Sequence, residues 1–513
     1  MLILSLGSDY FHDAFQKLGH SVLVPPHQEG FPLESLYNNL SDRPDLIVFT
    51  DNIGRHAWPE GLSKIYGIPK IYYAVDTPIN FWWQKNYAQL FDHVFVDQLP
   101  YVSQLEALGI PATWLPVGVD TKSYLPQNKE EPEKLYDFGF VGVIDSQVRP
   151  KRDRLVNLIS QHYTLKTMGG RESDWVGPDE SSTIYRQSKL ALNENLFPGV
   201  TMRMLEAMAS GAVLFTEKAG GDLGEIFKPG EDFAWFEPHE LLETAKLWLA
   251  DKNLRKKTAK RALEKVEASH DIFNRAETLL TKIKNVHLDY AKKDEAAWDW
   301  EAKTLFLTAL RWHKQDGQAR LLRSEKLFRT AFSSSRISPE GLFMLGHIQR
   351  LKRNLDEAIH FLTLAYEAGE PRGALGLGIF NLGLQKPLEA SQWLGKFTNI
   401  TDFPALTMDT LHFEAVKLIA KRLMEIGEDL SPGFSRAPHD PALWTAFEYY
   451  LTVFNAVPGD LEITHNLLKI LLKYGCMAEA LDVTQKALEY NPEDDFLNSV
   501  FCEAGRASYL SIN

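Results

Sequence analysis

The sequence predicts an α/β protein with an all-α extension, namely two Rossmann-like domains followed by a helical-repeat domain. Short apolar runs alternate with amphipathic segments in residues 1–120, which is typical of βαβ units. The same alternation restarts in residues 136–285. From residue 297 onward no strand-like runs occur, and small residues recur at the spacings that paired helices require. A chain of 513 residues is long enough for two to four domains.

The first domain is expected to hold a parallel sheet. Its apolar runs are continuous in Ile, Val, Leu and Tyr, without alternation, which indicates strands covered on both faces. The expected strands are residues 2–6, 21–25, 44–50, 69–75, 92–96 and 111–116. Residues 1–120 therefore form one doubly wound domain.

A second domain of the same kind follows a linker. Residues 121–135 are polar, charged and contain proline, which is typical of a linker. The expected strands of the second domain are residues 136–142, 163–169, 189–195, 211–217 and 231–237. Helical segments separate them, so we expect a second Rossmann-like domain over residues 136–285.

The last part of the chain carries a repeat. Leu468, Ala480 and Ala487 are spaced by twelve and seven residues, and similar spacings recur earlier, as at Gly346 and Ala358. Antiparallel helix pairs need small residues where they cross closely, and tetratricopeptide repeats place them this way in a 34-residue unit. We expect a tetratricopeptide-like (TPR-like) domain over residues 297–510, with divergent helices in residues 398–458.

Composition argues against several classes of function and location. The formal net charge of −13 argues against nucleic acid as a partner, because a polyanion needs a basic face. Cys476 and Cys502 match no metal-ligand spacing and no disulfide framework, which favours a reducing compartment. The apolar start of the chain is too short for a signal peptide, and no run is long enough to cross a bilayer. We expect a cytoplasmic protein with peripheral membrane contact at most.

Residues 190–217 predict a phosphate site. They suggest a strand, a loop and a helix over residues 201–209, and a loop that leads into a helix N-terminus suits a phosphate. Arg203, in the first helical turn, can add a charge-assisted hydrogen bond. Glu206 lies one turn later and can accept hydrogen bonds from ribose hydroxyls. The alternative is an ordinary surface ion pair on an amphipathic helix.

This segment also carries a family resemblance. The run R-x-x-E-A-M-A-x-G-A, with Asn193 on the preceding strand, resembles the donor-nucleotide signature of group 1 glycosyltransferases, nearest to the spore-maturation (CgeB-like) branch. The resemblance covers most of residues 1–285. It implies a GT-B fold, in which the second Rossmann-like domain holds a nucleotide-sugar.

The resemblance also implies a set of donor-binding residues. FVGVIDSQVRPKRDRL resembles the start of the family's nucleotide-binding domain, where a glycine and a following arginine, here Gly142 and Arg152, approach the diphosphate. Together with Arg203 near the diphosphate and Glu206 near the ribose, these residues and Asn193 form the expected donor site. Many relatives carry a second glutamate eight residues before the one at Glu206. Here that position is Pro198.

On the first domain, two sites follow expected strands. Gly7 and Ser8 come after the first strand, where a glycine turn lets a ligand approach the backbone or simply makes a tight turn. Asp76 ends the fourth strand, and the carboxyl ends of parallel strands form the ligand crevice. Its carboxylate can orient or deprotonate an acceptor hydroxyl. A helix N-cap or a turn-stabilising aspartate is the alternative.

These features predict a metal-independent glycosyltransferase. The sequence contains no Asp-x-Asp, no P-loop and no H-E-x-x-H, so we expect no metal and no cofactor besides a nucleotide-sugar donor, first of all a UDP-sugar. A helix dipole and an arginine would stabilise the leaving diphosphate. The resemblance implies retaining, hexosyltransferase-type chemistry.

The shape expected of the repeat domain indicates which class of acceptor the enzyme would use. Stacked helix pairs form surfaces suited to polypeptides, which favours a protein acceptor such as a bacterial surface or flagellar protein. A polysaccharide or lipid-linked glycan is the enzymatic alternative. A non-catalytic scaffold with a degenerate GT-B fold is the alternative of another class, and it is motivated by Pro198.

Overall fold

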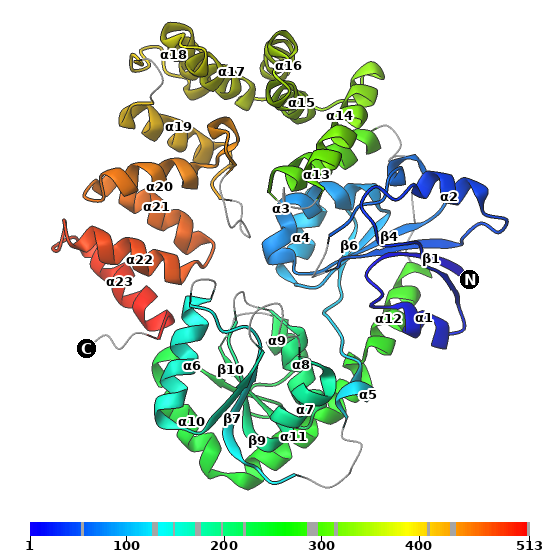
Figure 1. Ribbon diagram of the computed structural model, residues 1–513. Helices are drawn as coiled ribbons and strands as arrows, with labels where there is room; N and C mark the ends of the chain where they lie inside the picture. Colours follow the sequence, from blue (N-terminus) through cyan, green and yellow to red (C-terminus); the bar gives the residue numbers. More distant parts are fainter. Residues whose placement is uncertain are drawn as a thin grey trace.

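The computed structural model describes residues 1–52, 56–125, 132–146, 149–169, 176–195, 199–218, 222–284, 296–311, 316–407, 411–430 and 438–509. Two parallel α/β sheets are followed by a long series of helices, which confirms the predicted fold class. Pro198 lies outside the described residues. Figure 1 shows the two α/β domains one above the other, with the helices curving from the upper domain round to the lower one.

The first α/β domain is built on a six-stranded sheet. Its strands are β1 (Leu2–Gly7), β2 (Ser21–Leu23), β3 (Leu46–Thr50), β4 (Lys70–Ala74), β5 (His93–Val96) and β6 (Ala112–Trp114). They are all parallel, in the order β2-β1-β3-β4-β5-β6. Every residue of β3, β4 and β5 is buried, as the unbroken apolar runs predict. The chain reverses its direction of strand addition between β1 and β3, which makes this the topological switch point.

Helices cover both faces of this sheet. They are α1 (His12–Lys17), α2 (Leu33–Asn39), α3 (Thr77–Tyr87) and α4 (Pro100–Ala107), with short 3-10 turns η1 (Leu62–Lys64) and η2 (Ala88–Leu90). The short helix α5 (Thr121–Tyr124) begins the connection to the second domain.

The second α/β domain repeats this design with five parallel strands. They are β7 (Tyr136–Val141), β8 (Leu165–Met168), β9 (Ser188–Asn193), β10 (Val213–Glu217) and β11 (Ala234–Phe236), in the order β11-β10-β9-β7-β8. Its switch point therefore lies between β7 and β9. The surrounding helices are α6 (Pro150–His162), α7 (Pro178–Gln187), α8 (Met202–Ala209), α9 (Asp222–Ile226), α10 (Leu241–Ala250) and α11 (Lys252–Lys265), with η3 (Pro238–Glu240) and the π-turn η4 (Val266–His270).

One helix returns from the second domain to the first. α12 (Ile272–Lys284) packs against α1, and Ala276 and Leu279 share a buried cluster with Phe15 of α1. At the crossing, the Asp271 carboxylate accepts hydrogen bonds from the Thr121 backbone N–H (3.1 Å) and hydroxyl (2.6 Å). The two α/β domains are thus connected both at the linker and through α12.

The remaining helices form one curved body, which we call the arch. Its helices are α13 (Ala297–Arg311), α14 (Gly317–Ser333), α15 (Pro339–Leu351), α16 (Leu355–Glu367), α17 (Arg372–Gly383), α18 (Pro387–Thr398), α19 (Phe413–Glu425), α20 (Ala446–Ala456), α21 (Leu461–Lys473), α22 (Met477–Leu488) and α23 (Asp495–Ala507), with the 3-10 turn η5 (Pro441–Leu443). Successive helices pack in pairs. A Cβ at Gly346 would lie 2.8 Å from Leu362, and one at Gly378 would lie 2.6 Å from Leu394. Close helix crossing therefore explains the small residues of the repeat.

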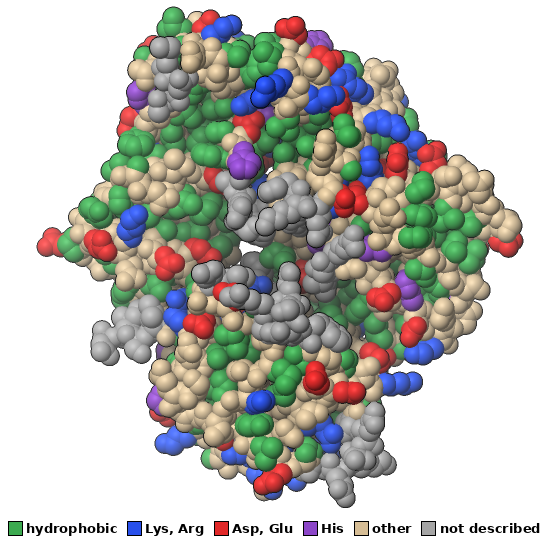
Figure 2. All heavy atoms as spheres, viewed as in Figure 1, with side chains coloured by type: hydrophobic (Ala, Val, Ile, Leu, Met, Phe, Trp, Pro, Cys, Tyr) green, Lys and Arg blue, Asp and Glu red, His purple; other side chains and the backbone are tan. Residues whose placement is uncertain are grey.

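The arch touches both α/β domains. At its start, α13 packs on α3, and the Arg320 guanidinium donates to Glu29 at 3.0 Å. At its other end, α23 packs on η3 of the second domain. The space-filling view shows a central opening between the arch and the two domains, with apolar side chains gathered on the arch beside it (Figure 2). Across the described ranges, no helix has the length and apolar character needed to cross a bilayer.

Candidate active site

The carboxyl ends of the two sheets face each other. The Gln98 amide, directly after β5, donates to the Val200 carbonyl at the start of α8 (3.2 Å). The Leu99 backbone N–H donates to the carboxylate of Asp222, the first residue of α9 (2.7 Å). Carboxyl ends of parallel strands form the ligand crevices of α/β proteins, so a site between the domains would draw on both sheets.

Three predicted residues meet at the switch point of the second domain, and we call them the Arg203 cluster: Gly142, Asn193 and Arg203. Gly142 follows β7 with a φ of +148°, and a Cβ there would lie 2.6 Å from an Nη atom of Arg203. Arg203, in the first turn of α8, donates from Nη1 to Oδ1 of Asn193 at 3.3 Å. Glycine at position 142 therefore lets a guanidinium lie against the backbone at the edge of the sheet.

Arg152 lies beside this cluster but is already engaged. Its guanidinium is buried and donates to the Glu194 carboxylate (3.0 Å) and to the Val143 carbonyl (2.9 Å). Burial, and then the neighbouring Arg203, lower its pKa to about 10. The Glu194 carboxylate neutralises the positive charge of Arg152. The hydrogen bond from Arg152 to the Val143 carbonyl fixes the loop between β7 and α6.

Sequence reasoning predicted Asn193 at the end of β9 but missed the polar residues beside it, Asn195 and Glu217. Lys151 forms an ion pair with Glu217, the last residue of β10, at 2.7 Å. The amide of Asn195 donates to the Glu217 carbonyl (3.2 Å), and Asn193 donates to Asn195 (2.9 Å). The signal in the sequence is that both apolar runs end in polar residues, N-E-N and T-E.

Glu206 points toward the interdomain connection. It lies beside the hydroxyl of Tyr124 in α5. Burial raises the pKa of Glu206, while Tyr124 and Arg203 offset part of that rise. The carboxylate is therefore one helical turn from Arg203, as predicted, on the side of the cleft where the chain joins the two domains.

A cavity of about 220 Å³ occupies the switch point of the first domain. It is lined by Ser8, Tyr10, Thr50, Asp51, Asn52, Tyr73, Val75, Val117 and, from α8 of the second domain, Met202. Gly7 has a φ of +82°, and a Cβ there would overlap the Thr50 carbonyl oxygen. The glycine is thus required by the close approach of β1 and β3. Ser8 is the residue that reaches the cavity, and its backbone N–H donates to Thr50 at 2.9 Å.

Asp76 precedes α3 in a strained conformation. Its φ of +52° is unusual for a residue other than glycine. The side chain makes no capping hydrogen bond to α3, although the residue occupies the N-cap position. Burial raises the pKa of Asp76, and the guanidinium of Arg149, at the start of α6, offsets part of that rise. Asp76 thus lies within electrostatic reach of the second domain.

Two buried carboxylates, at the ends of the two strands that flank β4, were also missed. Asp51, after β3, accepts hydrogen bonds from Tyr72 (2.8 Å) and Gln84 (2.7 Å). Asp97, after β5, accepts from the Asp76 backbone N–H at 2.8 Å. Burial raises the pKa of each carboxyl to about 7. Three consecutive strands of the first sheet therefore lead into an aspartate.

No metal cluster accompanies these groups in the described ranges, where no three His, Cys, Asp or Glu side chains gather in a way that would hold an ion.

Comparison with known proteins supports a relationship for part of the chain. The family model described as glycosyl transferase-like matches residues 146–281. The matched residues include most of the second α/β domain and most of α12. No curated protein matches the chain by sequence.

Solved structures resemble part of the chain at low identity. Sucrose-phosphate synthase from Thermosynechococcus elongatus has a TM-score of 0.42 at 12% identity, over 56% of this chain and 99% of that one. Anabaena HepE in complex with UDP and glucose has a TM-score of 0.40 at 15% identity, over 56% of this chain and 100% of that one. The Arg203 cluster contains Asn193 and Arg203 from the glycosyl transferase-like segment and Gly142 from just before it.

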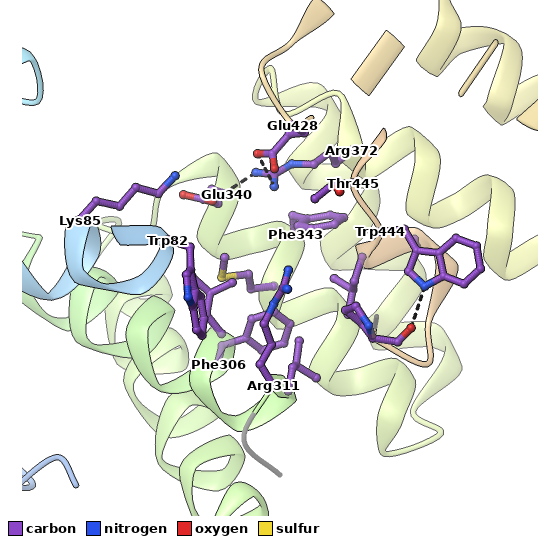
Figure 3. Close-up of a pocket in the computed structure, with 16 residues that line it drawn as sticks. Trp82, Lys85, Phe306, Arg311, Glu340, Phe343, Arg372, Glu428, Trp444 and Thr445 are labelled. Atoms are coloured by element: carbon purple, nitrogen blue, oxygen red, sulfur yellow. Dashed lines mark hydrogen bonds and ion pairs between the residues drawn. The ribbon is translucent and has the colours of Figure 1, made fainter. Parts of the chain in front are cut away.

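A second hollow lies apart from the glycosyl transferase-like domain, where α3 meets the inner side of the arch (Figure 3). Its aromatic lining residues are Trp82, Phe306, Phe343 and Trp444, and its charged ones are Lys85, Arg311, Glu340, Arg372 and Glu428. Arg372 pairs with Glu340 (3.2 Å) and Glu428 (2.9 Å). The Arg311 guanidinium lies 5.4 Å from the centre of the Trp82 ring and points into the hollow in Figure 3.

Proposed function

We propose that the protein is a metal-independent glycosyltransferase that transfers a sugar from a nucleotide-sugar, with a UDP-sugar as the first donor to test. One observation carries this proposal: Gly142, Asn193 and Arg203 converge at a topological switch point of the glycosyl transferase-like domain. The backbone at Gly142, the N-terminus of α8 and the Arg203 guanidinium would hold the donor diphosphate. Glu206 would accept hydrogen bonds from the ribose.

The proposed chemistry uses charge from both domains. As the bond between the sugar and the diphosphate breaks, negative charge grows on the leaving phosphate, and the α8 dipole and Arg203 stabilise it without a metal. On the opposite side, Asp76 would orient or deprotonate the acceptor hydroxyl. Asp51 competes for that role because it lines the cavity and its pKa is near neutrality.

The stereochemical outcome follows from the resemblance to group 1 enzymes, and we propose retaining hexosyl transfer. An anomeric assignment of the product by NMR spectroscopy checks it, and inversion at the anomeric carbon would refute it.

The donor proposal is tested with purified protein and a panel of UDP-, GDP- and dTDP-sugars. We expect one nucleoside diphosphate to bind, and its sugar to be transferred or slowly hydrolysed. Arg203→Ala should lose donor turnover. Lys257→Ala, which removes a charge from the exposed surface of α11 in the same domain, should keep it. Failure of every nucleoside diphosphate to bind at millimolar concentration would instead favour the scaffold alternative.

We further propose a cytoplasmic enzyme whose acceptor is a polypeptide held by the arch, which we regard as TPR-like. The support is the hollow in Figure 3, where aromatic faces and charged groups from α3 and the arch lie together beside the first domain. Such a mixture suits an extended polypeptide segment with apolar and charged side chains.

Acceptor variants separate this idea from glycan transfer. Trp444→Ala and Lys85→Ala alter partly exposed lining residues, so we expect them to lower transfer of labelled sugar to polypeptides without changing donor binding. Phe413→Ala on α19, outside the hollow, is the matched control. Transfer only to lipid-linked glycan or polysaccharide would refute the protein acceptor.

A further inference from the structure

The end of the arch docks into the core of the second α/β domain. Beyond α23, the Ser508 carbonyl accepts a hydrogen bond from Nε of Arg154 in α6 at 2.8 Å. Tyr509 follows, and only 8% of it is exposed. Its ring belongs to the buried cluster that contains Phe236 of β11 and Leu241 of α10. Figure 1 shows α23 arriving beside α6. The arch is therefore anchored in this domain by a buried aromatic side chain.

The same side chain reaches the polar end of β10. Tyr509 lies beside the carboxylate of Glu217, which with burial raises the pKa of its hydroxyl. The Lys151 ammonium pairs with Glu217 at 2.7 Å and lies 5.9 Å from the centre of the Tyr509 ring. Burial raises the pKa of the Glu217 carboxyl, and Lys151 and the Tyr509 hydroxyl each offset part of that rise.

Lys151 is unusual in its position. It is the second residue of α6, whose N-terminus carries a partial positive charge that disfavours a cation. Arg152 and Arg203 lie nearby, and Glu217 and Glu194 form the ion pairs with Lys151 and Arg152 among the described residues. Arg149 is a fourth nearby cation, and Glu206 is a third carboxylate. Four cations against three carboxylates, together with two helix N-termini, leave a net positive site, which an anion would neutralise.

We propose that Tyr509 is a positioning residue of the donor site, which the arch supplies to hold the Glu217–Lys151 pair so that the ammonium faces the donor diphosphate. This inference rests on the proposed function. The arch is fixed to the first domain at its start and to the second domain at its end. It therefore becomes part of the donor-binding unit. Docking of α23 and binding of the nucleotide then favour each other.

Tyr509→Phe tests the inference because it removes the hydroxyl and keeps the ring in its cluster. We expect the Kd of the bound nucleoside diphosphate, found among UDP, GDP and dTDP, to rise about 2- to 10-fold, the worth of one hydrogen bond. The donor KM should rise with it while kcat stays nearly constant. The melting temperature should not fall, since no packing is lost. A purely structural tyrosine would leave Kd and KM unchanged.

A double-mutant cycle with Lys151→Ala gives a second readout. If Tyr509 acts through Lys151, the double variant binds the nucleotide no more weakly than Lys151→Ala alone, whereas additive losses would overturn the inference. Tyr490→Phe, an exposed tyrosine after α22, is the matched control and should behave like the wild type. If the wild type binds no nucleoside diphosphate, the proposed function fails. If Arg203→Ala loses binding and Tyr509→Phe does not, only the present inference fails.

Discussion

Arg203 and Arg152 belong to the same domain, yet their surroundings predict opposite effects of alanine substitution. Arg203 is partly exposed, and its hydrogen bond goes to the neutral amide of Asn193. Removing it breaks no ion pair among the described residues and withdraws only part of the offset at Glu206, so we expect the protein to lose at most about 1.5 kcal/mol of unfolding free energy. Arg152 and Glu194 are both buried and form an ion pair at 3.0 Å. Arg152→Ala leaves the Glu194 carboxylate unpaired, which costs about 3–5 kcal/mol.

For donor binding we expect the larger loss from Arg203→Ala, the variant that we expect to lose less stability. A charge-assisted hydrogen bond to phosphate contributes about 1.5–3 kcal/mol, so Arg203→Ala should raise the Kd for the nucleoside diphosphate about 10- to 150-fold. Isothermal titration calorimetry measures this Kd, and differential scanning fluorimetry measures the melting temperature. A loss of 3–5 kcal/mol in Arg152→Ala corresponds to about 6–20 °C in a domain of this size.

Two results would refute this reasoning. One is a Kd for Arg203→Ala within twofold of the wild type. The other is an Arg152→Ala variant that melts like the wild type. As an internal check, adding Glu194→Gln to Arg152→Ala removes the unpaired charge and should recover part of the lost stability, because the two residues act as a pair.

Three further predictions concern the strand ends. Burial raises the pKa of Asp51 and of Asp97 to about 7 in the folded protein, above the ordinary value near 4. Between these pH values the folded state binds more protons than the unfolded state, so stability should fall as pH rises from about 4 to about 7. Asp97→Asn should flatten this fall in thermal melts at several pH values, and an unchanged slope would contradict the assignment. Gly7→Ala should lower the unfolding free energy by more than about 1 kcal/mol, because its Cβ would meet the Thr50 carbonyl at a positive φ, while donor affinity stays unchanged. Gly142→Ala should weaken nucleotide binding by displacing the Arg203 guanidinium, and it should add little to Arg203→Ala; full additivity would separate the two residues.

Local patterns predicted much of the fold and part of the site. Strands buried on both faces leave continuous apolar runs in the sequence, so β3, β4 and β5 could be found from composition alone. Asn193 and Arg203 are ten residues apart, and they belong to one strand–loop–helix unit whose geometry is local. The same locality explains why the small residues at Gly346 and Gly378 predicted close helix crossings.

The parts of the site that the sequence did not predict depend on contacts between segments that lie far apart in the chain. The resemblance placed Arg152 near the diphosphate, but nothing in the sequence indicated its buried ion pair with Glu194, 42 residues away. Asp51 and Asp97 follow strands, as many surface residues do, and their burial depends on which helices cover that edge. The contact between Arg154 and Ser508 joins residues 354 positions apart. No periodicity in the sequence indicates that the end of the arch returns to the second domain.

The charge distribution across the cleft argues for a transferase rather than a nucleotide-binding scaffold. Both sheets use the same strand order, so each offers a ligand cradle at its switch point. A scaffold that only binds a nucleotide needs the cationic cradle at Gly142 and Arg203. Asp51 and Asp97 accept hydrogen bonds within the first domain and so also serve its structure. A scaffold gains nothing from Asp76, which makes no capping hydrogen bond and costs stability when it is buried and ionised. A transfer reaction uses both the cationic cradle and a carboxylate opposite it, because an anion leaves on one side and a hydroxyl loses its proton on the other. Asp76, within electrostatic reach of Arg149 in the second domain, is therefore the feature that a degenerate fold would leave unexplained.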